Sequence, residues 1–411
     1  MSSPPISNTT ASLDPFRAVG AGERHAVYAA LTEAGPVHRL ETAGSSAIWL
    51  VTGHAAARAL LADPRMVKGG WRNARYVKEL GDEVARAAHT HMLYTDPPDH
   101  GRLRRLVGSA LSRRRVERMA PRIEQVTHAL LTEAEREAGP DGRGPVDLVP
   151  ALAAPLPIIV LCELIGIPED TAADLRSWTP PLMAAALCSF EEYRHSTLEV
   201  LRFTRELIAL RRAEPQDDLL SDLIAARDGA DRLSEDELTS LMFLLLVAGH
   251  ETTVHMIGNC VRSLLAHPDQ LALVRERPEL LEPAIEELLR YDGPLQTTVP
   301  YIATEPVDVA GVTIPPGEPV FIGLLAANRD PARFPGGDIL DITRDGPAHI
   351  AFGHGVHHCV GAPLARLEAR LALGILLSRF PRLRLAAPAG ELMMLPSVLS
   401  NGLAALPVFL R

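Results

Sequence analysis

The chain reads FGHGVHHCVG from Phe352 to Gly361, and this loop is the strongest indication of its fold. Glycines on both sides of Cys359 let the backbone approach a flat, bulky partner closely. A helix is predicted from Pro363 to about Leu377, and the N–H groups at a helix N-terminus favour a thiolate just before it. Zinc is a poorer interpretation, because the spacing of structural zinc ligands is absent. An isolated cysteine in such a loop would usually be inert, but the surrounding pattern indicates a binding site.

A second unusual segment lies in a long helix that is predicted from Ser234 to Ala266. Ser234 and Glu237 form a capping box at its start. At ~1.5 Å per residue its roughly 32 residues would span about 48 Å and cross the whole domain. Its apolar middle is followed by AGHETT at 248–253, a glycine, a carboxylate and two hydroxyls at the buried centre. Polar residues and a glycine at the buried centre of an apolar helix are locally unfavourable, and such positions tend to mark functional sites. The ordinary alternative is a core hydroxyl bonded to the preceding turn.

Composition indicates a folded, mainly helical protein with a small β part. The 411 residues carry 41 basic and 51 acidic side chains, a formal charge of −10, and 47% are hydrophobic. These values exclude a disordered chain and argue against non-specific nucleic-acid binding. Helices are expected at His54–Ala62, Arg122–Ala138, Ile158–Leu164 and Phe203–Arg212. Short strands are expected at Ile48–Thr52, Val307–Val309 and Pro319–Ile322.

The chain is expected to form one domain over residues 1–411, with a flexible N-terminus at 1–15. Its four cysteines lie far apart, which excludes zinc ribbons and makes a disulfide framework improbable. The N-terminus lacks the order of a signal peptide, and no stretch approaches the ~20 apolar residues that span a bilayer. A cytoplasmic protein that binds neither membrane nor nucleic acid, and that is a monomer, is therefore expected.

Five motifs in a fixed order make the sequence resemble the cytochrome P450 superfamily over nearly its whole length. The run from Phe352 to Gly361 fits that family's F-x-x-G-x-H-x-C-x-G loop at every fixed position. The other four matches are A-G-x-E-T at 248–252, E-x-x-R at 287–290, His100-x-x-x-Arg104, and Ala327-Asn328-Arg329-Asp330-Pro331. The resemblance implies the α-rich P450 fold with a long helix over haem b, and a monooxygenase that uses dioxygen.

The resemblance assigns roles residue by residue. Cys359 would be the thiolate ligand of the haem iron. Glu251 and Thr252 would deliver protons during oxygen activation. Ala248 and Gly249 would border the haem, with a local widening of the helix at Gly249. The remaining cofactor-binding residues would be His100, Arg104 and His357 at the propionates, Phe352 beside the cysteine sulfur, Gly361, and Tyr301. Glu287 and Arg290 would form a structural pair in the core.

Tyr301 departs from the family pattern, which usually has Arg or His at this position. Two outcomes are open: its hydroxyl donates to a haem propionate, or its ring faces the substrate pocket. The first is favoured, because the flanking sequence keeps the family register. Tyr301→Phe is then expected to loosen haem retention.

The substrate is expected to be a hydrophobic natural product, most like a macrolide or polyketide, that is hydroxylated or epoxidised. The expected pocket residues are mostly apolar, which suits such a ligand. They are Leu245, Val247, Ala248, Leu295, Thr297, Thr298, Val299 and Val398. A terpenoid or steroid-like substrate fits nearly as well. A peroxide-driven peroxygenase and a non-catalytic haem-thiolate binder are weaker alternatives. The substrate's identity and the oxidised position stay open.

Electrons are expected to come from NAD(P)H through a ferredoxin reductase and a ferredoxin. Seven arginines crowd between residues 102 and 118 of an acidic chain. Such a patch would steer an acidic partner, and Arg102 and Arg113 are the candidate docking residues. Thr253 is expected to point away from the site and to serve as a control for Thr252.

Overall fold

The computed structural model describes residues 14–18, 20–41, 47–70, 75–139, 141–168, 171–183, 188–228, 233–346 and 348–411. Thirteen of the fifteen N-terminal residues expected to be flexible lie outside these ranges. The helices are α1 Ala21–Ala34, α2 His54–Ala62, α3 Arg75–Leu80, α4 Asp82–His89, α5 Asp99–Ala110, α6 Arg113–Arg118, α7 Ala120–Glu137, α8 Pro155–Ile165, α9 Ala172–Trp178, α10 Pro180–Met183, α11 Phe190–Ala213, α12 Leu219–Asp228, α13 Glu235–Ala248, α14 Glu251–Ala266, α15 Pro268–Glu276, α16 Leu281–Asp292, α17 Leu324–Ala327 and α18 Ala362–Arg379.

Single turns of other helix types join these elements: η3 Val149–Ala153, η5 Pro278–Leu280, η6 Gly355–His357 and η7 Ala389–Glu391. The strands are β1 Val37–Leu40, β2 Ile48–Val51, β3 Met66–Val67, β4 Pro145–Asp147, β5 Tyr301–Ala303, β6 Val307–Val309, β7 Val312–Ile314, β8 Pro319–Ile322, β9 Arg384–Leu385 and β10 Pro407–Phe409.

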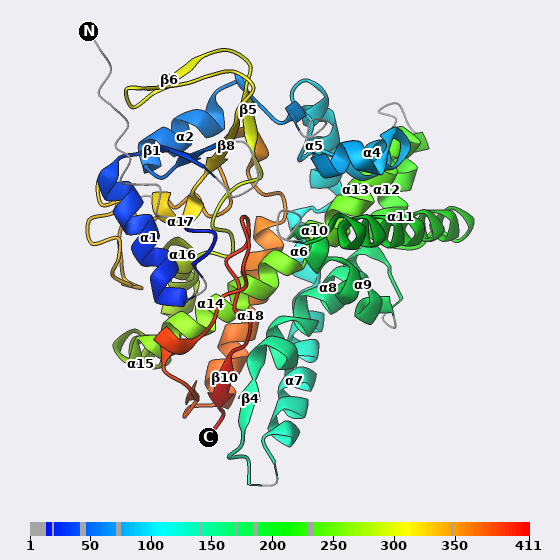
Figure 1. Ribbon diagram of the computed structural model, residues 1–411. Coiled ribbons are helices and arrows are strands. Elements are labelled where there is room, and N and C mark those ends of the chain that lie inside the picture. Colours follow the sequence, from blue (N-terminus) through cyan, green and yellow to red (C-terminus); the bar gives the residue numbers. More distant parts are fainter. Residues whose placement is uncertain are drawn as a thin grey trace.

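The largest sheet brings distant segments together in the order β1-β2-β8-β5-β3. It lies beside α1 and α2, apart from most of the helices (Figure 1). Its strands β2, β5 and β8 bury apolar side chains such as Leu50, Ala303 and Ile322. Strand β5 pairs antiparallel with both β8 and β3. Because β3 and β5 are antiparallel, the end of β3 lies next to the start of β5, at one end of the sheet.

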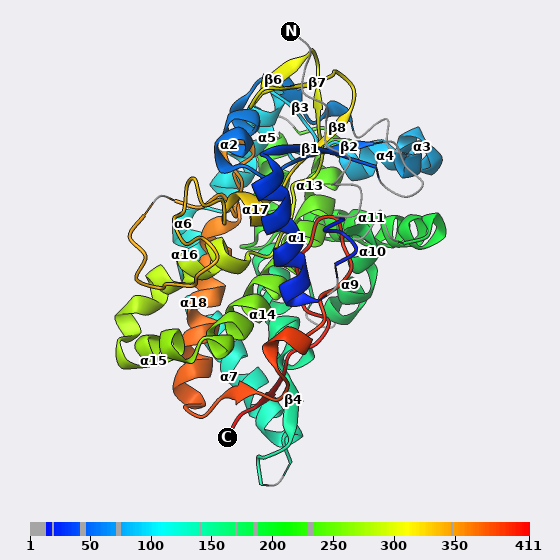
Figure 2. The same cartoon turned by 60° about the vertical axis from the view of Figure 1, so that its left-hand side comes forward.

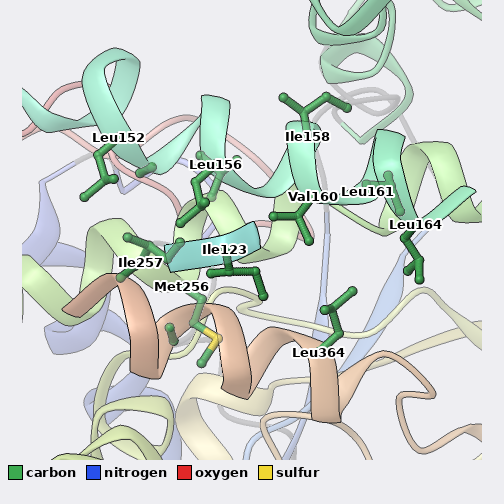
Figure 3. Packing of buried hydrophobic residues seen from close by; sticks show 14 of the residues in the cluster. Ile123, Leu152, Leu156, Ile158, Val160, Leu161, Leu164, Met256, Ile257 and Leu364 are labelled. Atoms are coloured by element: carbon green, nitrogen blue, oxygen red, sulfur yellow. The ribbon is translucent and has the colours of Figure 1, made fainter. Parts of the chain in front are cut away.

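The helical core is built around α14, which packs against α16 and α18, while α18 also packs on α7 (Figure 2). Apolar side chains of four elements point toward one another there: Ile123 of α7, Leu156 of α8, Met256 of α14 and Leu364 of α18 (Figure 3). All but Leu364 are at most 2% exposed. Because this core fixes α14 against α18, it also fixes the helix over the cysteine loop.

The sequence predictions for regular elements are largely confirmed. Helix α2 and strand β8 begin and end at the predicted residues. The capping box at Ser234 is present. Helix α11 is longer than predicted, because Ser189 and Glu192 form a second capping box upstream of the predicted start. The sequence predicted strands β2, β6 and β8, and it did not predict β1, β3, β4, β5, β7, β9 and β10.

One prediction about the long helix needs correction. In the structure it is interrupted, since α13 ends at Ala248 and α14 begins at Glu251. Its length and mean hydropathy of 1.4 over an 18-residue window would also suffice to cross a membrane. The sequence-based expectation that no segment is long and apolar enough to span a bilayer is therefore corrected. However, 72% of it is buried inside the protein, as in the core helix of a soluble protein.

Candidate active site

The cysteine loop lies at the floor of a cavity, between η6 and the start of α18. The backbone N–H of Cys359 donates to the carbonyl of Phe352 at 2.9 Å, which closes the loop. Gly355 has a φ of +72°, and a Cβ there would lie 2.5 Å from the carbonyl of Leu61. Only glycine fits this approach. The close approach at Gly355 is thus to α2 of the chain itself, and the predicted approach of the loop glycines to a flat partner stays a prediction.

The Cys359 side chain is exposed, but to the cavity that it lines rather than to the outer surface. Burial raises the pKa of its thiol, while the N–H groups of Gly361 and Ala362 and the charge of Arg104 act in the opposite direction. These groups stabilise a thiolate once an electrophilic metal is bound. Phe352 lines the same cavity, with the guanidinium carbon of Arg366 4.4 Å from its ring centroid.

One wall of the cavity gathers side chains that can carry positive charge. His100 and Arg104 come from α5, and His357 comes from η6. The rings of His100 and His357 lie 4.4 Å apart, and the ring of Tyr301 lies 6.2 Å from that of His357. Burial, followed by the charges of Lys68, His100 and Arg104, lowers the pKa of His357 to about 3. Within the described ranges, Arg104 has no carboxylate partner.

The helix break lies on the opposite side of the cavity. Ala248, Gly249 and Thr252 line it, and the Thr252 hydroxyl donates to the carbonyl of Ala248 at 3.2 Å. The structure shows an interruption rather than the expected widening at Gly249, whose N–H still donates to the carbonyl of Leu245 at 3.0 Å. Thr253 also lines the cavity, so it does not point away as predicted. The break changes the local rotation on which that prediction relied.

Glu251 does not lie among the cavity-lining residues, although Thr252 does. Its carboxylate oxygens lie 3.7 Å from Nε2 of His250 and 3.7 Å from Nε2 of His255. Burial raises the pKa of Glu251 and lowers the pKa of each histidine to about 4. His250 is also in contact with the hydroxyl of Thr179 at 3.1 Å. Glu251 and Thr252, which were predicted to act together, therefore lie in different surroundings. The Thr252 hydroxyl borders the cavity, and the Glu251 carboxylate lies between two histidines.

The Glu287 and Arg290 side chains form a buried ion pair on α16. The guanidinium donates to both carboxylate oxygens at 2.7 and 2.8 Å. It also donates to the carbonyls of Asn328 and Gly337 at 2.9 and 2.7 Å. Arg344 donates to Glu287 from the other side at 3.1 Å. This network ties α16 to the segment that leads into the cysteine loop.

The cavity encloses about 1760 Å³, the open space at its mouth included. Of the predicted pocket residues, five besides Ala248 line it: Leu245, Leu295, Thr297, Thr298 and Val299. Val247 and Val398 do not. All the predicted cofactor-binding residues line the cavity. Further apolar lining side chains are Met92, Leu93, Met183, Leu244, Met256 and Leu399.

Two charged residues of the cavity were missed by the sequence analysis. Lys68 follows β3 and is 1% exposed; it is one of only two lysines in the chain. Glu368 on α18 has a carboxylate oxygen without a hydrogen-bond partner, and burial raises its pKa to about 8. The rarity of lysine was the one available signal for Lys68.

The predicted arginine patch is mostly paired within the chain. Arg102 pairs with Glu237, and Arg113 with Glu117 at 2.7 Å. Arg115 contacts Asp222 at 2.6 Å and Asp217 at 3.3 Å, and Arg118 lies 3.8 Å from Asp217. Arg105 and Arg114 are exposed, and the described part of the chain offers them no carboxylate partner. The free positive charge is therefore smaller than the sequence suggests.

Comparison with known proteins identifies the class. The model of the cytochrome P450 family matches residues 172–384. Cytochrome P450 107B1 of Saccharopolyspora erythraea is 48% identical over 94% of this chain and 95% of that protein. The 6-deoxyerythronolide B hydroxylase of that organism is 42% identical over 93% and 94%. The tirandamycin C-bound P450 monooxygenase TamI is 40% identical, with a TM-score of 0.85 over 94% of this chain and 97% of that one.

The chain belongs to the cytochrome P450 family and is an oxidoreductase of the monooxygenase class. Within that family it is similar to bacterial hydroxylases of macrolides and polyketides.

The residues of the cavity fit a haem group, which the family implies. A thiol faces the cavity from its floor, apolar side chains form much of its walls, and cations gather at one side. A planar apolar ring with carboxylates along one edge matches this distribution. The buried cationic groups without carboxylate partners are the most specific part of the fit, because unpaired buried charge is costly.

Proposed function

We propose that this monooxygenase binds haem b through Cys359 and oxidises a hydrophobic natural product such as a macrolide or polyketide. The observation that carries the proposal is the Cys359 thiol, which faces a large apolar cavity beneath Thr252. When bound, a thiolate-ligated haem supplies activation of dioxygen and insertion of one oxygen atom into the substrate. The chain itself binds the cofactor and the substrate, orients them, and delivers protons to the site of oxygen activation.

Different residues of the cavity have different roles in binding the cofactor and delivering protons. His100, Arg104 and His357 hold the cofactor's carboxylates through charge-assisted hydrogen bonds. Ala248 and Gly249 border the cavity at the helix break, where dioxygen would be held. Thr252, at the cavity, positions water and passes protons on.

Burial raises the pKa of Glu251, because it favours the uncharged form of the carboxyl group. Since its carboxylate lies between His250 and His255, proton delivery requires the side chain to swing toward Thr252, or a water molecule to bridge them.

The substrate class is supported by the lining and by the relatives. Leu245, Leu295 and Val299 provide an apolar surface, and Thr297 and Thr298 contribute scattered hydroxyls. One relative is named a 6-deoxyerythronolide B hydroxylase, and one similar structure contains tirandamycin C. We favour hydroxylation, with epoxidation as the variant reaction. A terpenoid or steroid-like substrate is the alternative outcome of a ligand screen by the low-spin to high-spin shift.

We propose that electrons come from NAD(P)H through a ferredoxin. We also propose that the protein is a cytoplasmic monomer with one catalytic domain. Arg105 and Arg114 are better docking candidates than Arg102 and Arg113, because acidic neighbours already offset the latter two. Exposed Val356 lies in the cysteine loop and is 50% exposed. It offers an apolar contact at the centre of such an interface.

Replacing Cys359 with Ser tests the assignment directly. Under carbon monoxide the reduced wild-type protein should show the red-shifted thiolate band, and the variant should lack it while keeping its far-UV circular dichroism. Cys188→Ser is the matched control, since Cys188 is a half-buried cysteine that does not line the cavity. A thiolate band that persists in Cys359→Ser would contradict the proposal.

A second measurement separates the alternative functions. The wild-type protein should turn over with ferredoxin, its reductase and NAD(P)H. Product formed only with added hydrogen peroxide would indicate a peroxygenase, and a thiolate band without any turnover would indicate a haem binder.

A further inference from the structure

Lys68 is a buried lysine that lines the cavity. Its Nζ donates to the carbonyl of Val299 at 2.8 Å and lies 3.1 Å from the ring centroid of Tyr301. It is 1% exposed and borders the cavity. Among the described residues, no acidic side chain forms an ion pair with it. Burying an ammonium group without an anion is unfavourable, so an anion bound beside Lys68 would stabilise its charged form.

Sheet register explains why Lys68 meets Tyr301. Strand β3 pairs antiparallel with β5, with Met66 opposite Ala303 and Val67 opposite Ile302. Continuing this register by one residue sets Lys68 opposite Tyr301. The carboxylate of Asp96 accepts hydrogen bonds from the backbone N–H groups of Lys68 and Gly69, at 2.9 and 3.1 Å. The backbone of Lys68 is thus fixed from two sides.

The Tyr301 ring serves as a seat for the lysine. An ammonium group over an aromatic face is attracted by the ring quadrupole. At 3.1 Å the contact is close, and it depends on the ring rather than on the hydroxyl. Tyrosine at position 301 carries no positive charge, and its ring holds the ammonium group of Lys68 at this position instead.

Lys68 extends the cationic wall formed by His100, Arg104 and His357. All four side chains line the same cavity together with Tyr301. The ring of Tyr301, over which Lys68 lies, is 6.2 Å from the ring of His357. Burial lowers the pKa of Lys68 well below its usual value, and Asp96 acts in the opposite direction. The oxygens of Asp96 already accept hydrogen bonds from backbone N–H groups. Four cation-capable groups that face one space suit an anion with more than one carboxylate.

We propose that Lys68, seated on the Tyr301 ring, binds a haem propionate and replaces the cation that position 301 lacks in this chain. This inference rests on the proposed haem binding. It assigns a role to the ring of Tyr301 and differs from the expectation that the Tyr301 hydroxyl donates to the propionate. Lys68 is a cofactor-binding residue in this assignment, and Tyr301 is a positioning residue.

The test measures haem retention in the loaded protein, by the rate of haem transfer to excess apomyoglobin. A charge-assisted hydrogen bond typically contributes ~1.5–3 kcal/mol, so Lys68→Met should lose haem roughly tenfold faster or more. Lys68→Arg should retain haem, because it keeps the charge. Lys78→Met is the control, since Lys78 is the other lysine and is exposed. It should behave as the wild type.

Two variants of Tyr301 distinguish the contribution of its ring to haem retention from that of its hydroxyl. Tyr301→Phe keeps the ring and should retain haem nearly as well as the wild type. Adding Tyr301→Arg to Lys68→Met should restore retention by returning a cation to the family position.

Rapid haem loss in Tyr301→Phe, with Lys68→Met unchanged, would overturn the inference in favour of the hydroxyl. Equal haem loss by Lys68→Met and the wild type would overturn it outright. In either case a thiolate carbonyl band in the wild type would show that haem binding through Cys359 itself still holds.

Discussion

Thr252 is the hydroxyl at the helix break that reaches the cavity, and Thr252→Ala should separate electron use from product formation. Proton transfer by a positioned side chain typically raises the reaction rate by ~10²–10⁴-fold. Without the hydroxyl, reduced oxygen should leave as peroxide, so product formed per NAD(P)H should fall steeply while NAD(P)H oxidation continues. The measurement is product, peroxide and NAD(P)H in one reaction.

Thr127 provides the matched control for this substitution. It is a buried helical threonine whose hydroxyl donates four residues back, to Ile123 at 2.7 Å, and it does not line the cavity. Thr127→Ala should leave the product yield per NAD(P)H unchanged even if it lowers stability. An unchanged yield in Thr252→Ala would reject the proposed role.

At the scale of the element, the break between α13 and α14 depends on Gly249. A Cβ at this residue would lie 2.3 Å from the carbonyl of Leu245 and 3.1 Å from Cδ1 of Leu161 on α8. Gly249→Ala should therefore lower the free energy of unfolding by about 1–3 kcal/mol, the typical cost of overpacking. Denaturant unfolding of the two proteins measures this difference.

Gly258 lies within α14 and is the matched control for Gly249. A Cβ there would lie 3.8 Å from Leu403, an ordinary contact. Because Ala is favoured over Gly in a helix interior by about 1 kcal/mol, Gly258→Ala should be neutral or stabilising. Equal effects of the two substitutions would show that the break does not require glycine.

At the scale of the whole molecule, Asp292 holds remote segments together. Its carboxylate accepts hydrogen bonds from His25 of α1 at 2.9 Å and from Asn401 near the C-terminus at 2.9 Å. It also pairs with Arg262 of α14. Asp292→Asn should lower the free energy of unfolding by about 3–5 kcal/mol, because a buried Arg262 loses its partner.

The same cluster predicts how stability depends on pH. Burial alone would raise the pKa of Asp292, but Arg262 and His25 outweigh it and hold the pKa well below its usual value. The folded state therefore favours the charged form, and this stabilisation is complete above the unfolded-state pKa of about 3.9 and is lost as the pH falls below it. Unfolding from pH 3 to 8 should show a smaller acid loss in Asp292→Asn than in the wild type.

Asp222→Asn is the control for this substitution. Asp222 pairs with Arg115, but its side chain is 53% exposed, and exposed pairs contribute about 0–1 kcal/mol. If both variants lose the same small amount of stability, the Asp292 cluster does not hold the segments together.

The sequence by itself determined the family, the helix that bears Thr252 and the loop that bears Cys359. These features depend on local chemistry: a capping box, glycines around one cysteine, and polar residues in an apolar helix. Helix α2 and strand β8 could be located because turn residues bound them and their apolar pattern is regular.

Only the tertiary structure decided which side chains share the cavity. Strand β3 has two residues, too few for any periodicity, and it exists because it pairs with a strand more than 230 residues away. That pairing is what brings Lys68 to Tyr301. The interrupted helix likewise turns Glu251 toward His250 and His255, and the pairing of Arg102 with Glu237 reduces the free charge of the arginine patch. The contacts of Lys68 with Tyr301 and of Arg102 with Glu237 join residues far apart in the chain, which local sequence patterns do not encode.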